Sequence, residues 1–110
     1  MNQDLGRKVQ VKQILKAVQE VAPGRSVELR IPPYAAIQCV GGTTHLRGTP
    51  PNVDEMKAKT LIKLLESPDL WEQFCDLGAI SASGTNSNLG NLFDQVSKLM
   101  NSEVRSANGK

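Results

Sequence analysis

The segment from residue 27 to residue 52 constrains the fold most, because apolar and polar residues alternate along it until the chain reaches Gly41–Gly42. Alternation with a period of two is typical of a β-strand that is buried on one face. The apolar residues before the glycines fall at odd positions, and they are Val27, Leu29, Ile31, Ala35, Ile37 and Cys39. We therefore predict a β-hairpin with one face in the core and the other outside it.

The outward face of this hairpin is a candidate partner-binding surface. A two-residue turn at Gly41–Gly42 would place Gln38 opposite His45 on that face, and Ile37 opposite Leu46 on the core face. The polar residues that would then share the outward face are Tyr34, Gln38, His45 and Arg47. A phenol, an amide, an imidazole and a guanidinium suit contact with a protein or a polar headgroup. An ordinary solvated sheet face is the alternative.

The remaining segments predict helices and two short strands. Apolar residues at helical spacing indicate helices over residues 8–22, 60–66, 68–77 and 89–100, and alternation indicates strands over 53–56 and 79–83. This order predicts an α+β fold, with an antiparallel β-sheet of four to five strands and helices covering one face. We expect a single domain over residues 1–102 and a mobile C-terminal tail over 103–110, which has no periodicity.

Composition excludes several classes of partner. The net charge is +2 and the charged residues are dispersed, which is too weak a pattern for nucleic-acid binding. No apolar run approaches the roughly 20 residues that span a bilayer, and the N-terminus lacks an apolar signal core. Cys39 and Cys75 are far apart in the sequence, and we expect both to be reduced thiols. We expect a cytoplasmic protein with no transmembrane segment.

Catalytic chemistry has little support in the sequence. His45 is the only histidine, and the predicted register puts Cys39 on the opposite face from it. One histidine and two cysteines on separate elements do not have the spacing of metal ligands. We therefore expect no enzymatic activity, no catalytic residue, no metal and no cofactor.

Three segments of the chain resemble the sterol carrier protein type 2 family, and its compact bacterial branch most. They are residues 27–40 (VELRIPPYAAIQCV), 45–53 (HLRGTPPNV) and 77–84 (LGAISASG). The resemblance implies a sheet whose apolar face and last helix enclose a tunnel for fatty-acyl or sterol-like molecules. The residues that it places around such a ligand are Trp71, Phe74, Ile80, Leu92, Phe93, Val96 and Leu99.

Two functions are therefore compatible with the sequence. The first is non-enzymatic binding or carriage of a small apolar ligand between the sheet and the last helix. The second is an accessory protein-interaction module that uses the Tyr34, Gln38, His45 and Arg47 face and has no ligand cavity. A carrier needs about 300 Å³ or more of apolar space beneath the last helix, whereas a module needs none.

Overall fold

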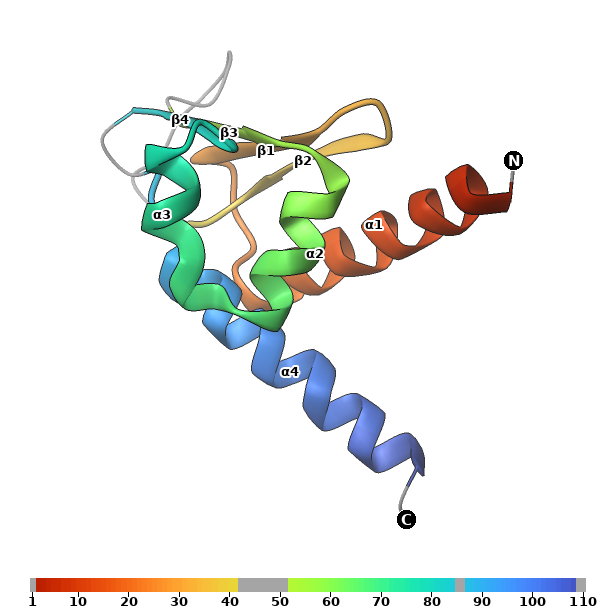
Figure 1. Ribbon diagram of the computed structural model, residues 1–110. Coiled ribbons are helices and arrows are strands. Elements are labelled where there is room, and N and C mark those ends of the chain that lie inside the picture. The colour runs from red at the N-terminus through yellow and green to blue at the C-terminus, as the bar shows by residue number, and fades with distance from the viewer. Residues whose placement is uncertain (1, 42–51, 85–86, 109–110) are drawn as a thin grey trace.

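A computed structural model of the protein describes residues 2–41, 52–84 and 87–108. Four strands form one sheet in the order β2-β1-β3-β4, and the helices all lie against the same face of it (Figure 1). This arrangement confirms the predicted α+β fold. In chain order the elements are α1 (Asn2–Val21), β1 (Val27–Ile31), β2 (Ala35–Cys39), β3 (Asn52–Met56), α2 (Ala58–Glu66), η1 (Pro68–Leu70), α3 (Trp71–Asp76), β4 (Ile80–Ser83) and α4 (Gly90–Asn108).

The described hairpin turns at Pro32–Pro33. We expected residues 27–40 to run as one strand, and this was wrong, because β1 ends at Ile31 and the chain folds back into β2. Neither proline has an N–H group to donate to a sheet, so the pair favours a turn. The amide of Tyr34 closes that turn on the carbonyl of Ile31, at 2.8 Å. The hairpin predicted across Gly41–Gly42 lies outside the described residues.

The predicted inner and outer faces are nevertheless correct for the described strands. Leu29 pairs with Ile37, so the odd positions of β1 and β2 share a face. Val27, Leu29 and Ile31 are completely buried there, as is Cys39, while Ile37 is partly buried. The face assignments survive because the turn keeps odd residues opposite odd residues.

The sheet is mixed, although we expected it to be antiparallel. The β1–β2 and β3–β4 pairs are antiparallel, but β3 lies parallel to β1. A parallel neighbour requires a connection longer than a hairpin loop, and residues 40–51 between β2 and β3 have that length. Pattern reasoning identified the strands, but it did not identify this pairing.

Two long helices supply much of the core beneath the sheet. From α1 the core receives Val11, Ile14, Leu15 and Val18, and from α4 it receives Leu92, Phe93 and Val96. Burying one such side chain contributes about 1.5–3 kcal/mol. Helix α1 begins before residue 8, and α4 continues to Asn108, through most of the segment expected to be a tail. The mobility of that tail stays a prediction.

Gly24 allows the entry to β1 to pass close to the end of β2. Its φ is +152°, and a Cβ atom there would overlap the backbone carbonyl of Val40. We predict that Gly24→Ala lowers the free energy of unfolding by at least about 2 kcal/mol, through the backbone conformation and the clash. Chemical denaturation measures this change.

Gly6→Ala is the matched control for that substitution. Gly6 lies in α1, and nothing stands within 4 Å of an added Cβ. Alanine should therefore raise the stability by about 0.5–1 kcal/mol through helix propensity. Equal effects of the two substitutions would contradict the tight approach at Gly24.

Candidate functional site

The residues expected to contact a ligand all belong to one hydrophobic cluster. Trp71, Ile80 and Phe93 are buried in it, together with Leu92 and Val96, whereas Phe74 and Leu99 pack at its edge. The rings of Trp71 and Phe93 stack with centroids 6.1 Å apart. Side chains fill the space under α4 at Phe93 and Val96, which are both 0% exposed. Their role in ligand binding stays a prediction.

A cleft of about 560 Å³ opens beside this cluster. It lies between the η1–α3 segment and the start of α4, and Trp71 is the aromatic residue in its wall. This volume exceeds the lower limit of about 300 Å³ for small-molecule sites. The lining residues are Pro68, Asp69, Trp71, Glu72, Asn88, Gly90, Asn91 and Asp94.

The start of α4 shapes one side of this cleft. The amide of Gly90 donates a hydrogen bond of 2.9 Å to Oδ1 of Asn88, which satisfies one of the free N–H groups at the beginning of the helix. A Cβ atom at Gly90 would lie 3.5 Å from Cβ of Trp71. The absence of a side chain at Gly90 therefore leaves space beside the indole.

Asp54 is a polar residue that we did not select from the sequence. It lies on β3 with 0% of its surface exposed, and neither of its carboxyl oxygens has a hydrogen-bond partner among the described residues. Burial raises the pKa of this carboxyl group from 3.8 to about 7. The sequence contained one indication of this burial, because Asp54 is two residues from Met56 and therefore shares the inner face of β3 with it. However, the apolar Val53 on the outer face indicated the opposite orientation.

Both cysteines are free thiols, and the charge of Asp54 affects the pKa of each. Burial, and then the charge of Asp54, raise the pKa of Cys39 to about 11. Burial also raises the pKa of Cys75, and the nearby carboxylates of Asp54, Asp76 and Glu72 add to the effect. A thiol is nucleophilic only as the thiolate, so these environments do not activate either cysteine.

The predicted partner-binding face is only partly described. Oε1 of Gln38 accepts a hydrogen bond from Nε of Arg25 at 3.0 Å, and Tyr34 packs against the core at the β1–β2 turn. His45 and Arg47 lie outside the described residues. On the same outer side of the sheet, Nε of Arg30 lies 2.8 Å from Oε2 of Glu28. The grouping of the four residues on one face therefore stays a prediction.

Within the described part of the chain, no group of three or more His, Cys, Asp or Glu side chains is arranged to hold a metal ion. None of the helices in the described residues is long and apolar enough to cross a membrane.

Residues 5–94 match the family described as bacterial SCP ortholog, and the chain belongs to that family. This confirms the resemblance to the bacterial sterol carrier proteins. Membership indicates a lipid-carrier role in general, in a family whose members are generally not catalysts. The search of curated proteins found no match.

The burial of Asp54 predicts a pH-dependent stability. The unfolded chain ionises Asp54 near pH 3.8, but the folded protein retains the proton up to about pH 7. The stabilisation from that proton is complete below about pH 4 and is lost as the pH rises through 7. The shift of about three pKa units corresponds to about 4 kcal/mol.

Asp54→Asn removes the titrating group and tests this prediction. The stability of the variant relative to wild type should increase by about 4 kcal/mol between pH 4 and pH 8, measured by denaturant unfolding at each pH. Glu55→Gln, on the exposed side of β3, is the control and should show little such trend. A constant difference between Asp54→Asn and wild type would contradict the prediction.

Proposed function

We propose that the protein binds or carries a small apolar ligand without chemical change, between the sheet and the last helix. The observation that carries this proposal is the 560 Å³ cleft at Trp71, whose ring stacks on the buried Phe93 of α4. A ligand that enters there meets the Trp71 ring first and then the apolar cluster beneath α4. Membership of the SCP family supports the same type of ligand.

The binding mechanism is passive. An alkyl chain gains roughly 0.8 kcal/mol for each methylene that leaves water, so about ten buried methylenes correspond to micromolar affinity. The core under α4 must adjust to admit the chain, and this adjustment reduces the gain. The raised pKa values of the two thiols favour binding over catalysis. We expect this carrier to act in the cytoplasm.

The accessory module is the less favoured alternative. Its proposed surface is Tyr34, Gln38, His45 and Arg47, but the Gln38 side chain already binds Arg25. The Arg30 guanidinium on the same side of the sheet is paired with Glu28. Ion pairs of this kind are usual on a solvated sheet face, so the described residues add no support for recognition.

The cleft gives a direct test of ligand binding. A fluorescent probe with a decyl chain and a neutral head should bind with micromolar affinity, and the single tryptophan, Trp71, should report the binding through its own fluorescence. Asn91→Phe should weaken binding about tenfold or more, because the new ring occupies the cleft. Anisotropy titration measures both affinities.

Gln95→Phe is the matched control for the cleft substitution. Gln95 is exposed on α4 and does not line the cleft, so the same ring there should leave the affinity unchanged. Thermal melts establish that both variants fold. If the folded wild type showed no anisotropy or Trp71 change up to about 1 mM probe, the carrier proposal would be wrong.

A further inference from the structure

We propose that the ligand carries a hydrogen-bond-donating headgroup, an ammonium or a hydroxyl, which binds the carboxyl group of Asp54. Long-chain carboxylates should then be poor ligands. This inference rests on the proposed apolar-ligand function and specifies the chemistry of its ligand.

The first support is the absence of any partner for a completely buried group. Buried polar atoms are almost always hydrogen-bonded, and an unpaired one costs about 1–3 kcal/mol in proteins. Within residues 2–41, 52–84 and 87–108, both oxygens of Asp54 lack a partner, although Asn52 on the same face of β3 donates to the Ser26 carbonyl at 2.9 Å. The Asp54 carboxyl group therefore retains acceptor capacity that a ligand donor would satisfy.

The second support is the position of Asp54 one strand from the exposed edge of the sheet. Asp54 pairs directly with Ala82 of β4, so the two side chains point to the same face. Asp54 is fully buried but Ala82 is exposed, which places solvent one strand away. Strand β4 is at the edge of the sheet, and α3 packs against it.

Helix α3 packs against β4 and also contributes to the cleft. Trp71 lines the cleft, and Cys75 lies one helical turn further along the same side of α3. The proposal places the chain of the ligand against Trp71 and Phe93, and its head along this side of α3 toward Asp54.

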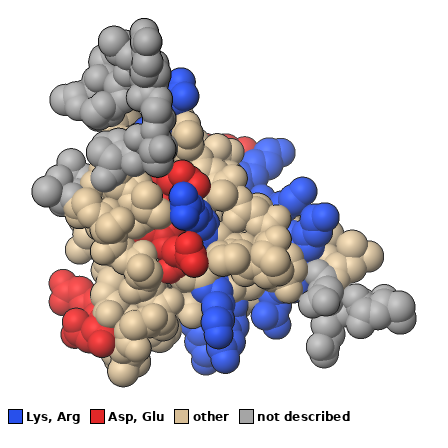
Figure 2. Space-filling model, turned by 90° about the horizontal axis from the view of Figure 1, so that it is seen from above, with Lys and Arg blue, Asp and Glu red and all other residues tan. Residues whose placement is uncertain are grey.

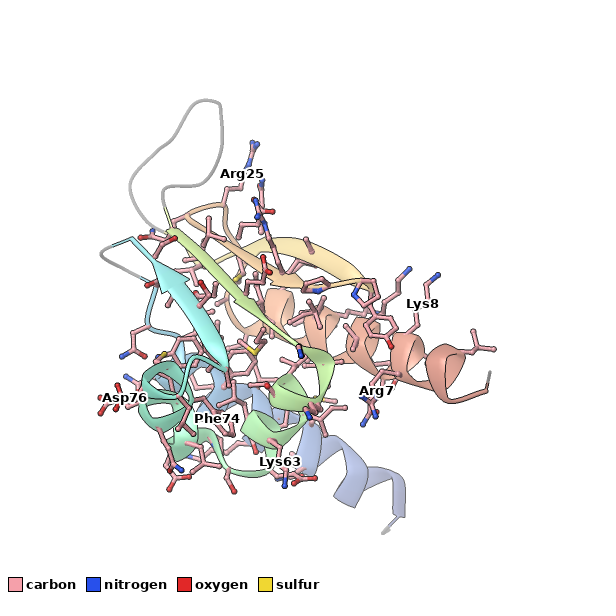
Figure 3. All side chains as sticks on the ribbon, turned by 45° about the horizontal axis from the view of Figure 1, so that its top comes forward. Arg7, Lys8, Arg25, Lys63, Phe74 and Asp76 are labelled. Atoms are coloured by element: carbon pink, nitrogen blue, oxygen red, sulfur yellow. The ribbon has the colours of Figure 1, made fainter. Side chains whose placement is uncertain are left out.

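The third support is the sign of the charge at the cleft. Asp69, Glu72 and Asp94 line it, and no Lys or Arg is among the lining residues that the structure describes, although Nζ of Lys98 pairs with Oδ2 of Asp94 at 3.1 Å. Figure 2 shows that the carboxylates at the α3 end of the molecule stand apart from Lys and Arg, whereas those on the outer sheet face lie beside basic side chains. In Figure 3, Asp76 on α3 also points outward. This field attracts a cationic head and repels a carboxylate.

The proposal predicts a pH dependence for an ammonium ligand. Cys39 of β2 and Cys75 of α3 are the titratable groups coupled to Asp54, and both keep their protons as the pH rises through 7. Glu28 and Arg30 of the neighbouring strand β1 are on the outer face, as is Glu55. An ammonium must displace the Asp54 proton at low pH. Its affinity should therefore fall about tenfold from pH 8 to pH 6.

The test uses four decyl compounds that differ in the headgroup: decylammonium, decanol, methyl decanoate and decanoate. Trp71 fluorescence and calorimetry give their affinities for the full chain at about pH 8. Wild type should bind decylammonium and decanol about ten- to hundredfold more tightly than the ester, which only accepts hydrogen bonds, and decanoate most weakly. This order should persist at about 1 M salt, where the Debye length of about 3 Å screens the cleft carboxylates.

Substitutions at Asp54 separate charge from hydrogen bonding. Asp54→Asn keeps an acceptor oxygen, so it should retain the preference for decanol over the ester but lose the additional affinity for decylammonium. Asp54→Leu should lose both preferences. Glu72→Gln removes a carboxylate that lines the cleft and so tests selection by surface charge, whereas Glu55→Gln, on the exposed outer side of β3, is the matched control and should keep the wild-type order. Thermal melts check that each variant is folded. If Asp54→Leu is unfolded, Asp54→Asn alone provides the test.

The outcomes distinguish the two proposals. If wild type binds all four compounds equally, or if Asp54→Asn keeps the full decylammonium preference, the role of Asp54 is wrong and the carrier function stands. If decylammonium loses its advantage in Glu72→Gln but not in Asp54→Asn, the surface charge selects the head and the inference is again wrong. If no decyl compound binds, the carrier function fails and the inference fails with it.

Discussion

The burial of the whole inner face of β1 is the constraint on which the remaining structure depends. Val27, Leu29 and Ile31 are 0% exposed, and the strand has hydrogen-bonded neighbours on both sides. Its register with β2 is fixed at one end, where Ser26 Oγ donates to the Val40 carbonyl at 2.9 Å. Since β1 lies between β2 and β3, the position of β3 is set relative to the β1 strand, whose register with β2 is already fixed.

This register explains why an acidic residue is inside the protein. Asp54 faces inward because it is paired with Leu29 in the parallel β1–β3 pair, and the Asn52 bond to Ser26 holds that alignment. A shift of one residue would expose Asn52, Asp54 and Met56 and would bury Val53 and Glu55. Either register therefore places a carboxyl group inside, and the Asn52 bond to Ser26 accompanies the one that is observed.

The sequence predicted the structure best where one periodicity determined which residues are buried. The alternation at residues 27–39 gave the inner face correctly, and helical spacing identified the apolar sides of α1 and α4. It failed at Pro32–Pro33, where local turn chemistry interrupts the alternation. It also missed the β1–β3 pair, because parallel pairing is long-range and leaves no mark on either strand alone.

The candidate site likewise has one part that the sequence predicted and one part that it did not. The apolar residues Trp71 and Phe93 were accessible to sequence reasoning, since they follow from helical spacing and the family resemblance. The carboxyl group of Asp54 was not, because β3 has an apolar residue on the outer face and a charged one inside. Only the three-dimensional register reveals that Asp54 faces inward. Asp54 is the residue that we propose binds the polar end of a ligand.

If the proposed ligand binds Asp54, its loading is also coupled to stability. At neutral pH its burial opposes folding by several kcal/mol, a substantial part of the 5–15 kcal/mol typical of domains. A donor bound to the carboxyl group removes much of that penalty, and any ligand specific for the folded state stabilises it further by mass action. Such coupling makes the empty carrier the less stable form. The polar residue that weakens the core would then act as the element that distinguishes a loaded protein from an empty one.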